Sequence, residues 1–262
     1  MITMIIQIYE IQTPAEAKEM ISLGVDHIGS VLTSESQWKN DKIRDTVAYV
    51  NSTGAKSSLI PLFNTPDIVF RALDYYRPHI VHFCESICES MGDGNAKYNI
   101  CEKLIHLQKQ VKQRFPEISI MRSIPIARPG RSSFVPSLEL ARMFEPFSDY
   151  FLTDTLIISN SDGTAPADCQ PEAGFVGITG KICDWNVAEE LVKSSGIPVI
   201  LAGGLHPDNV GEAVIKTCPA GVDSCTGTNA VDGKGRSVRF EKDSQKVRRF
   251  VNTARKSASL SG

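Results

Sequence analysis

Polar and titratable side chains stand at or near the ends of several apolar, strand-length segments of the chain. They are Gln7, Tyr9, Glu10, His82, Cys84, Arg122 and Asp154. Carboxylate, imidazole and thiol groups are the usual acids, bases and nucleophiles of enzymes, so a fold that gathers these segment ends would build a site for proton transfer. Burying such groups bare is costly, and each therefore needs a polar partner or a ligand.

Four residues are candidates for the catalytic base. Each of them could instead have a purely structural role. Tyr9 could be a packed ring, His82 a hydrogen-bonded core histidine, Cys84 a small buried hydrophobe and Glu10 a solvated turn residue. Tyrosine has a reference pKa of ~10 against ~8.5 for cysteine, so it needs a nearby cation or hydrogen bonds to its phenolate to be a base. Histidine has the most suitable intrinsic pKa.

Strand-length apolar runs alternate with segments of helical period along the whole chain. We expect strands at 5–10, 27–32, 57–63, 79–85, 118–126, 150–154, 198–203 and 222–225, with helices near 14–23, 40–52, 65–76, 98–114, 136–146, 184–194, 207–217 and 243–256. Eight strand–helix units in a chain of 262 residues predict a single (β/α)8 barrel over residues 1–258, followed by a flexible tail at 259–262. A doubly wound open sheet is the alternative.

Two connections are longer than plain turns. Residues 86–97 follow the fourth predicted strand and residues 156–183 follow the sixth. Both start at the carboxyl end of a strand, which is the face where a barrel builds its site. Loops of this length are often lids or substrate loops.

Glycine-rich segments follow the last two predicted strands and predict a phosphate site. VILAGGLHPDNV (199–210) ends a strand at Gly203 and Gly204, and GVDSCTGTN (221–229) ends one at Thr226 and Gly227. Glycines let the backbone approach a ligand closely, and many barrels bind phosphate after strands 7 and 8. A third segment, GITGKICDW (177–185), adds Gly180 and Lys181. Each glycine pair alone could be a tight turn.

The composition excludes several classes of protein. A net charge of −2 gives no bulk attraction to nucleic acid or to an anionic membrane, and we expect neither as a partner. No run approaches ~18 apolar residues and the first residues do not form a secretion signal, so we expect a cytoplasmic protein. Seven scattered cysteines suit reduced thiols. Cys84-x-x-x-Cys88 near His82 lacks a second ligand pair, so no metal or cofactor is predicted.

With these motifs in register, the chain resembles the phosphoribosylanthranilate isomerase family. GxTGKxxDW (177–185), LAGGLxPxNV (201–210) and GVDxxxG (221–227) follow the family's order and spacing, and LGVDHIGSVL (23–32) and LTDT (152–155) match its second and sixth strands. The resemblance covers most of the chain and is strongest in the last third. It implies the barrel fold and a phosphosugar site, in which Gln7, Arg122 and Lys181 would bind substrate.

The resemblance also implies an Amadori rearrangement, in which an acid protonates the sugar ring oxygen and a base removes the proton at C2. Asp154 matches the family's acid. The family's base is the cysteine of a Lys-Ile-Cys-Gly segment, and here this segment reads Gln-Ile-Tyr-Glu, so Tyr9 replaces the cysteine. The arginine expected after the second strand falls near Trp38-Lys39. On this match, Gln7, Tyr9, His82, Cys84, Arg122 and Asp154 face the barrel interior.

We therefore expect an isomerase of the aldose–ketose or Amadori type that acts on a phosphorylated ribose derivative with an altered base. The alternatives are a lyase or aldol-type enzyme, metal-assisted chemistry at His82, Cys84 and Glu85, a non-catalytic phosphometabolite-binding protein, and the tryptophan-pathway reaction with a displaced base. The expected partner is a phosphorylated small molecule, and the expected assembly, if the protein forms one, is a homodimer.

Overall fold

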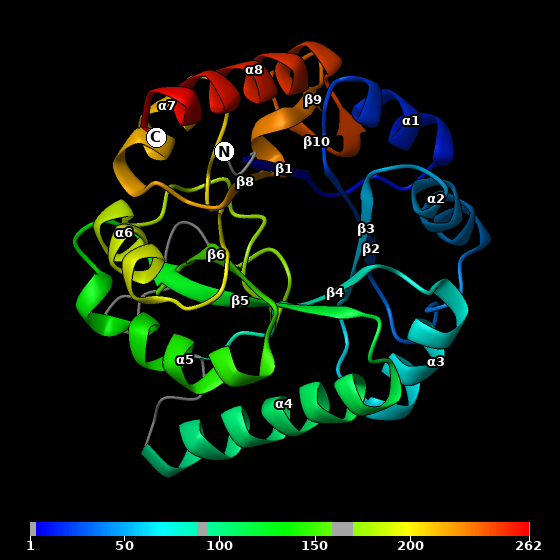
Figure 1. The fold of residues 1–262 in the computed structure, drawn as a ribbon, viewed down its shortest axis with the longest axis vertical. Helices are drawn as coiled ribbons and strands as arrows, with labels where there is room; N and C mark the ends of the chain where they lie inside the picture. The colour runs from blue at the N-terminus through cyan, green and yellow to red at the C-terminus, as the bar shows by residue number, and fades with distance from the viewer. Residues whose placement is uncertain (1–3, 88–93, 159–169, 262) are drawn as a thin grey trace.

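The computed structural model describes residues 4–87, 94–158 and 170–261 and contains a closed eight-stranded parallel barrel surrounded by helices (Figure 1). The strands are β1 (Ile5–Ile8), β2 (His27–Leu32), β3 (Lys56–Pro61), β4 (Ile80–Phe83), β5 (Ser119–Ala127), β6 (Tyr150–Leu156), β7 (Val199–Leu201) and β8 (Gly221–Ser224). The helices are α1 (Pro14–Ser22), α2 (Asp41–Asn51), α3 (Pro66–Tyr76), α4 (Gly94–Arg114), α5 (Ser137–Phe144), α6 (Trp185–Ser194), α7 (Val210–Thr217) and α8 (Ser244–Ser261).

The barrel closes because β1 pairs in parallel with β8 as well as with β2. The register aligns Gln7 with Asp223 and Ile8 with Ser224 across this seam. This closure confirms the predicted (β/α)8 fold and excludes the open, doubly wound sheet, in which the first and last strands of the sheet would be edges.

The barrel interior is filled by side chains that alternate along the strands with side chains facing the helices. One cluster holds the interior residues Tyr9, Val31, Ile80, Met121, Leu152, Ile200 and Ala202, while larger clusters fill the space between strands and helices. Gly29 on β2 makes room for the Tyr9 ring, since an added Cβ would lie 2.1 Å from its Cδ1 atom. The ring therefore fills the core of the barrel.

The predicted helix starts are confirmed where a capping residue precedes the helix. The Thr13 hydroxyl accepts a hydrogen bond from the Glu16 backbone N–H, with Pro14 in the first helical position. Asp184 caps α6 in the same way through the Asn186 N–H. These short-range signals fix where α1 and α6 leave the barrel mouth.

The structure adds an antiparallel hairpin that was not predicted, β9 (Asn229–Val231) and β10 (Ser237–Lys242), which lies between β8 and α8. Its turn is held by Asp232, whose side chain accepts hydrogen bonds from the N–H groups of Lys234 and Arg236. In Figure 1 the hairpin lies beside β1 and α8. α8 continues to Ser261 over residues assigned above to a tail, and the division at residue 258 stays a prediction.

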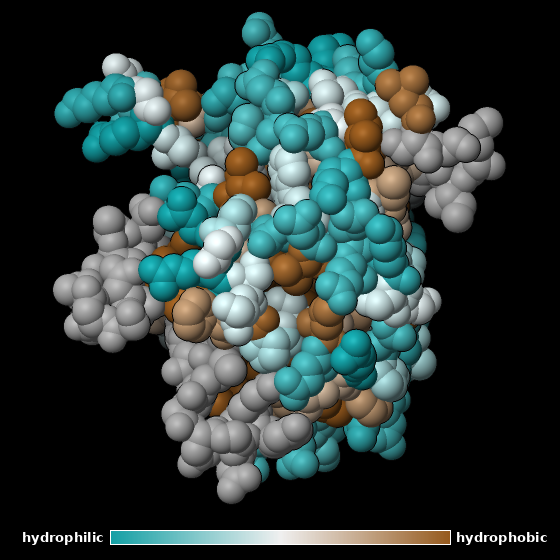
Figure 2. Space-filling model, turned by 90° about the vertical axis from the view of Figure 1, so that its left-hand side faces the viewer, coloured by the Kyte–Doolittle hydropathy of each residue, from teal (hydrophilic) through white to brown (hydrophobic). Residues whose placement is uncertain are grey.

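The outer surface is mainly polar on the side shown in Figure 2, where hydrophilic residues predominate and apolar side chains are scattered. Across the described ranges, every helix is either too short or too polar to cross a lipid bilayer.

Candidate active site at the carboxyl end of the barrel

Asp154 lies near the end of β6, where it lines the cavity at the mouth of the barrel. One of its oxygens accepts a hydrogen bond from the Thr155 backbone N–H at 2.8 Å. Burial nevertheless raises the pKa of Asp154 to about 7. Gly177, at φ 115°, lies against the other oxygen, since an added Cβ would be 2.2 Å from Oδ2. Near neutral pH this carboxyl group can donate a proton, as the general acid of the predicted reaction must.

Asp223 on β8 is a second carboxyl group at the mouth, and the candidates chosen from the sequence do not include it. It lines the same cavity as Asp154, and its Oδ1 accepts a hydrogen bond from Gln7 Nε2 at 3.2 Å. Burial, and next the nearby charge of Asp154, raise the pKa of Asp223 to about 8. The sequence contains a feature that could have indicated Asp223 as a site residue, because it belongs to the GVDxxxG motif that carries the family resemblance.

Gln7 holds the Asp223 carboxyl group in place through the hydrogen bond from its side-chain amide. Its side chain is fully buried, and its Oε1 lies 3.1 Å from Nδ1 of His27. Burial lowers the pKa of His27 to about 4, so this imidazole is neutral and can donate to Gln7 while the Gln7 amide donates to Asp223. The predicted placement of Gln7 in the interior is confirmed, and its role as a direct substrate ligand stays a prediction.

Tyr9 and His82 form a hydrogen-bonded chain inside the barrel. The Tyr9 hydroxyl lies 2.6 Å from Ser58 Oγ and 2.8 Å from His82 Nδ1, and His82 Nε2 lies 2.8 Å from Ser123 Oγ. Burial raises the pKa of Tyr9 well above its usual value and lowers that of His82 to about 3. Both groups are neutral at physiological pH and their polar atoms are engaged, so neither is a ready base.

Two thiols lie at the same mouth, Cys84 after β4 and Cys225 after β8. Burial raises the pKa of both thiols far above the neutral range. A protonated thiol is a weak nucleophile and a weak base. Cys88, the other half of the Cys84-x-x-x-Cys88 pattern, lies outside the described residues, which contain no cluster of three or more possible metal ligands.

Glu10 is buried and tied to the unpredicted hairpin, so it is not a solvated turn residue. Its Oε1 accepts from Arg239 Nε at 2.7 Å, and the Phe240 N–H donates to its other oxygen at 3.3 Å. Arg239 also donates through Nη1 to Glu172 at 2.8 Å. One arginine of β10 therefore bridges a residue after β1 and a residue of the loop between β6 and α6.

The prediction that Arg122 faces the barrel interior is wrong. Met121 and Ser123 face inward, so Arg122 between them points to the helices. There its guanidinium forms a buried ion pair with Glu85 and lies 4.6 Å from the centre of the Phe144 ring. A substrate in the barrel mouth is separated from this side chain by the wall of the barrel.

The residues at the mouth line two adjoining cavities. The first, which we call the mouth pocket, is lined by Tyr9, Glu10, Val31, Ile60, Leu62, His82, Cys84, Leu152, Asp154, Glu172, Phe175, Val176, Gly177, Ile178, Asp223 and Cys225. The second, the glycine hollow, is lined by Asp154, Ile178, Thr179, Gly180, Ala202, Gly203, Gly204, Leu205, Asp223, Ser224, Cys225, Thr226 and Gly227. Asp154 and Asp223 belong to both, so they stand at the junction of the two cavities.

The glycine hollow brings together all five predicted phosphate-binding residues, Gly180, Gly203, Gly204, Thr226 and Gly227. Gly204 needs to be glycine because its φ is 66° and an added Cβ would lie 2.5 Å from the Lys181 carbonyl carbon. The backbone of Lys181 thus lies against Gly204, and its carbonyl oxygen accepts a hydrogen bond from Thr155 Oγ1 at 2.6 Å. Lys181 itself does not line the hollow, and its predicted role as a substrate ligand stays a prediction.

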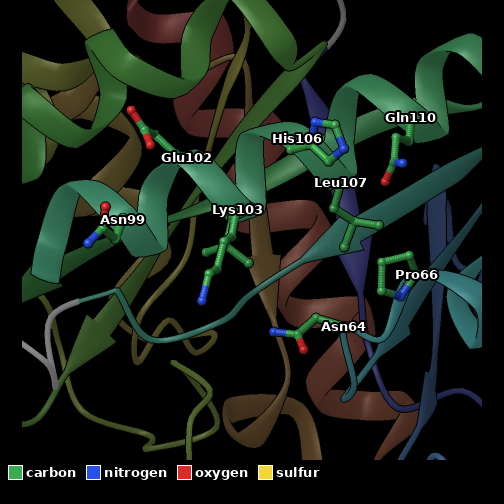
Figure 3. Close-up of a pocket in the computed structure, with 9 residues that line it drawn as sticks. Asn64, Pro66, Asn99, Glu102, Lys103, His106, Leu107 and Gln110 are labelled. Atoms are coloured by element: carbon green, nitrogen blue, oxygen red, sulfur yellow. The ribbon is translucent and has the colours of Figure 1, made fainter.

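A further hollow on the outside of the barrel is separate from this site. It lies between α4 and the start of α3, where Asn64, Pro66 and Lys103 are exposed (Figure 3). It shares no lining residue with the mouth pocket or the glycine hollow.

Fold and site together define a (β/α)8 barrel with a backbone-lined hollow after β7 and β8 and two carboxyl groups beside it. A family model described as N-(5'phosphoribosyl)anthranilate (PRA) isomerase matches residues 147–253. The chain is thus similar to the phosphoribosylanthranilate isomerase family over these residues, which make up less than half of its length.

Curated relatives carry the same name. The chain is 34% identical over 145 residues to N-(5'-phosphoribosyl)anthranilate isomerase 2 of Methanosarcina mazei, a match that covers 55% of this chain and 53% of that protein. The chain thus spans about half the length of the first relatives it matches. The enzyme of Desulfitobacterium hafniense is 28% identical over 97% of this chain and 99% of its own length.

Solved structures agree with the fold. Phosphoribosylanthranilate isomerase from Thermotoga maritima superposes with a TM-score of 0.66 at 18% identity, covering 97% of this chain and 99% of that one. The enzyme from Pyrococcus furiosus gives a TM-score of 0.64 at 19% identity, with the same coverage.

The raised pKa of Asp223 predicts how stability depends on pH. The folded state binds the proton of Asp223 more tightly than the unfolded state, so the stability from this group is fully present below pH ~4 and is lost as pH rises through about 8. Asp223→Asn removes this loss. We expect the variant's gain in the free energy of unfolding over wild type to be larger at pH 9 than at pH 5.

Urea denaturation at both pH values and constant ionic strength measures this difference. Asp45→Asn, on the exposed face of α2, is the matched control and should show the same difference from wild type at both pH values. An equal effect of Asp223→Asn at pH 5 and pH 9 would contradict the prediction.

Proposed function

We propose that the protein is an isomerase that converts an N-linked ribose phosphate into the corresponding 1-amino-1-deoxy-ketose phosphate. The observation that carries this proposal is the position of Asp154 and Asp223, which line both the glycine hollow and the mouth pocket. The backbone loops after β7 and β8 suit a phosphate group. A sugar whose phosphate lies there would have its ring between the two carboxyl groups.

Two groups must act on such a sugar, one that gives a proton to the ring oxygen and one that takes a proton from C2. With pKa values of about 7 and about 8, Asp154 and Asp223 together hold about one proton near pH 7.5. Asp154 has the lower pKa of the two, so the singly protonated pair holds its proton mainly on Asp223. The productive form, with Asp154 protonated and Asp223 ionised, is the minor tautomer of this pair. Both values lie near the operating pH, where general acid–base catalysis is most effective.

Asp154 gives its proton to the ring oxygen, the bond from that oxygen to C1 breaks, and the nitrogen lone pair forms a C1=N iminium. The Asp223 carboxylate takes the proton from C2, and the C2–H electrons form the C1=C2 bond of an enolamine while the iminium is neutralised. C1 then gains a proton and the C2 hydroxyl loses one, which yields the ketone. A proton passed from Asp223 to Asp154 restores the starting form.

Asp223 is the base in this scheme because its carboxyl group ionises near neutral pH. The other candidates are held in hydrogen bonds or ion pairs, or keep their proton far above neutral pH. Tyr9 and His82 are bonded to each other and to serines, the Cys84 thiol holds its proton, and Glu10 is paired with Arg239. The names of the relatives support an isomerase rather than a lyase or a non-catalytic binding protein.

The direct test follows the sugar by NMR in D2O with N-(5-phosphoribosyl) arylamines as substrates. An Amadori rearrangement forms the 1-arylamino-1-deoxyribulose 5-phosphate with deuterium from solvent at C1. The same ribosyl arylamines without phosphate are the control and should react far more slowly. No conversion of any phosphorylated arylamine, with the protein folded, would refute the proposal.

Replacing Tyr9 by phenylalanine tests whether the residue in the place of the family's cysteine is the base. Removing a catalytic base costs ~10²–10⁴-fold in rate, whereas we expect less than about tenfold for Tyr9→Phe. Stability should fall by about 1–3 kcal/mol, because Ser58 and His82 each lose a buried hydrogen-bond partner. Steady-state kinetics and urea denaturation measure both. A loss of turnover of three orders of magnitude in the folded variant would return the role of base to Tyr9.

A homodimer also belongs to this proposal, since a Thermotoga maritima relative is described as dimeric. The cytoplasmic location stays a prediction.

A further inference from the structure

We propose that this site selects ribose 5-phosphate derivatives whose N-linked group is an uncharged or cationic aromatic amine, and that it discriminates against an aromatic group that carries a carboxylate. This inference rests on the proposed function, because it concerns the part of the same substrate that lies beyond the sugar. The mouth pocket, which adjoins the glycine hollow through Asp154 and Asp223, is the space left for that part.

The walls of the mouth pocket suit a flat apolar group. Its aliphatic and phenyl lining residues come from β2, β3, β6 and the segments that follow β3 and β6, and are Val31, Ile60, Leu62, Leu152, Phe175, Val176 and Ile178. Burying an aromatic ring among such side chains is favourable because it removes apolar surface from water. Apolar walls give a carboxylate no compensation for its lost hydration.

The charged groups of the mouth pocket are acidic. Glu10, Glu172, Asp154 and Asp223 line it, and none of the described lining residues is a lysine or an arginine. Among the described lining residues, a substrate carboxylate would therefore meet like charge and no lysine or arginine side chain.

Two described cations that contact lining residues of the mouth pocket are already engaged by other groups. Arg239 donates to Glu10 at 2.7 Å and to Glu172 at 2.8 Å, so two carboxylates already surround one guanidinium. Lys242 donates to the Cys225 carbonyl oxygen at 3.0 Å and to the Asn229 side chain. A third carboxylate beside Arg239 would add more repulsion from the two glutamates than attraction from the single cation.

The test uses two stable ligands that differ only in the carboxylate. Reductive amination of ribose 5-phosphate with aniline gives 1-anilino-1-deoxyribitol 5-phosphate, and the same reaction with anthranilate gives its ortho-carboxy counterpart. Titration calorimetry at pH 7.5 measures the Kd of each. We expect the anilino ligand to bind at least about tenfold more tightly than the carboxylated one.

A pair of variants locates the cause of the preference. Glu172→Gln removes one negative charge from the mouth pocket and leaves Arg239 with one carboxylate partner, so it should reduce the ratio of the two Kd values severalfold. Glu190→Gln, on the exposed side of α6, is the matched control and should leave the ratio unchanged.

The outcomes separate this inference from the function on which it rests. Equal or tighter binding of the carboxylated ligand would overturn the inference and leave the isomerase proposal standing. Binding of neither ligand, with the protein folded, would overturn both. A preference for the anilino ligand that Glu172→Gln leaves unchanged would overturn the electrostatic origin argued here.

Discussion

Replacing Asp154 by asparagine is expected to lower turnover by about 10²–10⁴-fold, the usual loss when a general acid is removed. The amide keeps the shape of the side chain and can still accept the Thr155 N–H, so the fold should be preserved. It cannot give a proton to the ring oxygen. Steady-state kinetics with a phosphorylated arylamine substrate measures the loss, and Asp45→Asn is the control for a carboxyl group far from the mouth.

Asp223→Asn should lower turnover by a similar factor. The double variant Asp154→Asn/Asp223→Asn should lose little more, because the effects of removing an acid and a base that act together on one substrate are not additive. The pH–rate profile gives an independent readout. The wild type should lose activity above pH ~8, where the pair holds less than one proton, and this limb should vanish from the residual activity of Asp154→Asn. Wild-type turnover in Asp154→Asn would contradict the assignment of the acid.

Gly177→Ala tests the position of the same carboxyl group without removing it. A methyl group would have to occupy space 2.2 Å from Asp154 Oδ2, at a φ of 115° that disfavours side chains. A loss of turnover in this variant, with the carboxyl group still present, would show that the orientation of Asp154 matters as well as its chemistry.

The second large effect concerns stability. Arg122→Met should lower the free energy of unfolding by about 3–5 kcal/mol, because it leaves the Glu85 carboxylate buried without its cation. Nε and Nη2 of Arg122 have no hydrogen-bond partner among the described residues, so the ion pair is the main polar contact of this side chain. Urea denaturation measures the change.

The double variant Arg122→Met/Glu85→Gln is the matched control. Neutralising Glu85 should recover a large part of the lost stability, since an uncharged pair of similar volume is often tolerated at such a site. At a temperature where both variants are folded, KM for the phosphorylated substrate should change only a fewfold. A large rise in KM without a loss of stability would restore Arg122 as a substrate ligand.

The barrel fold and the convergence of the glycine segments could be predicted because their signals are local, while phosphate binding there stays a prediction. The Gly203-Gly204 pair follows its strand directly, and Thr13-Pro14 caps its helix directly. The sequence did not show whether Arg122 points into the barrel or toward the helices. In β5 both faces are buried, so apolar residues such as Ile120 and Met121 occupy both and give no alternation.

Asp223 and the Glu10–Arg239 contact were missed for another reason. Glu10 and Arg239 are 229 positions apart, and no periodicity connects residues so distant in the chain. The hairpin that carries Arg239 did have a sequence signal, an Asp-Gly turn at 232–233 between two short β-prone runs. Asp223 was visible as part of a motif, but its partners Gln7 and Asp154 come together only in the closed barrel.

The β1–β8 seam gives this site a dependence on complete folding. The hydrogen bond from Gln7 to Asp223 and the ion pair from Glu10 to Arg239 both cross from the first strand segment to the last part of the chain. A chain that ends before β8 would contain Asp154 and Tyr9 but neither Asp223 nor the second glycine segment. Catalytic activity should therefore appear only when the ring closes, and in refolding it would report the joining of the two chain ends rather than the formation of the individual strand–helix units.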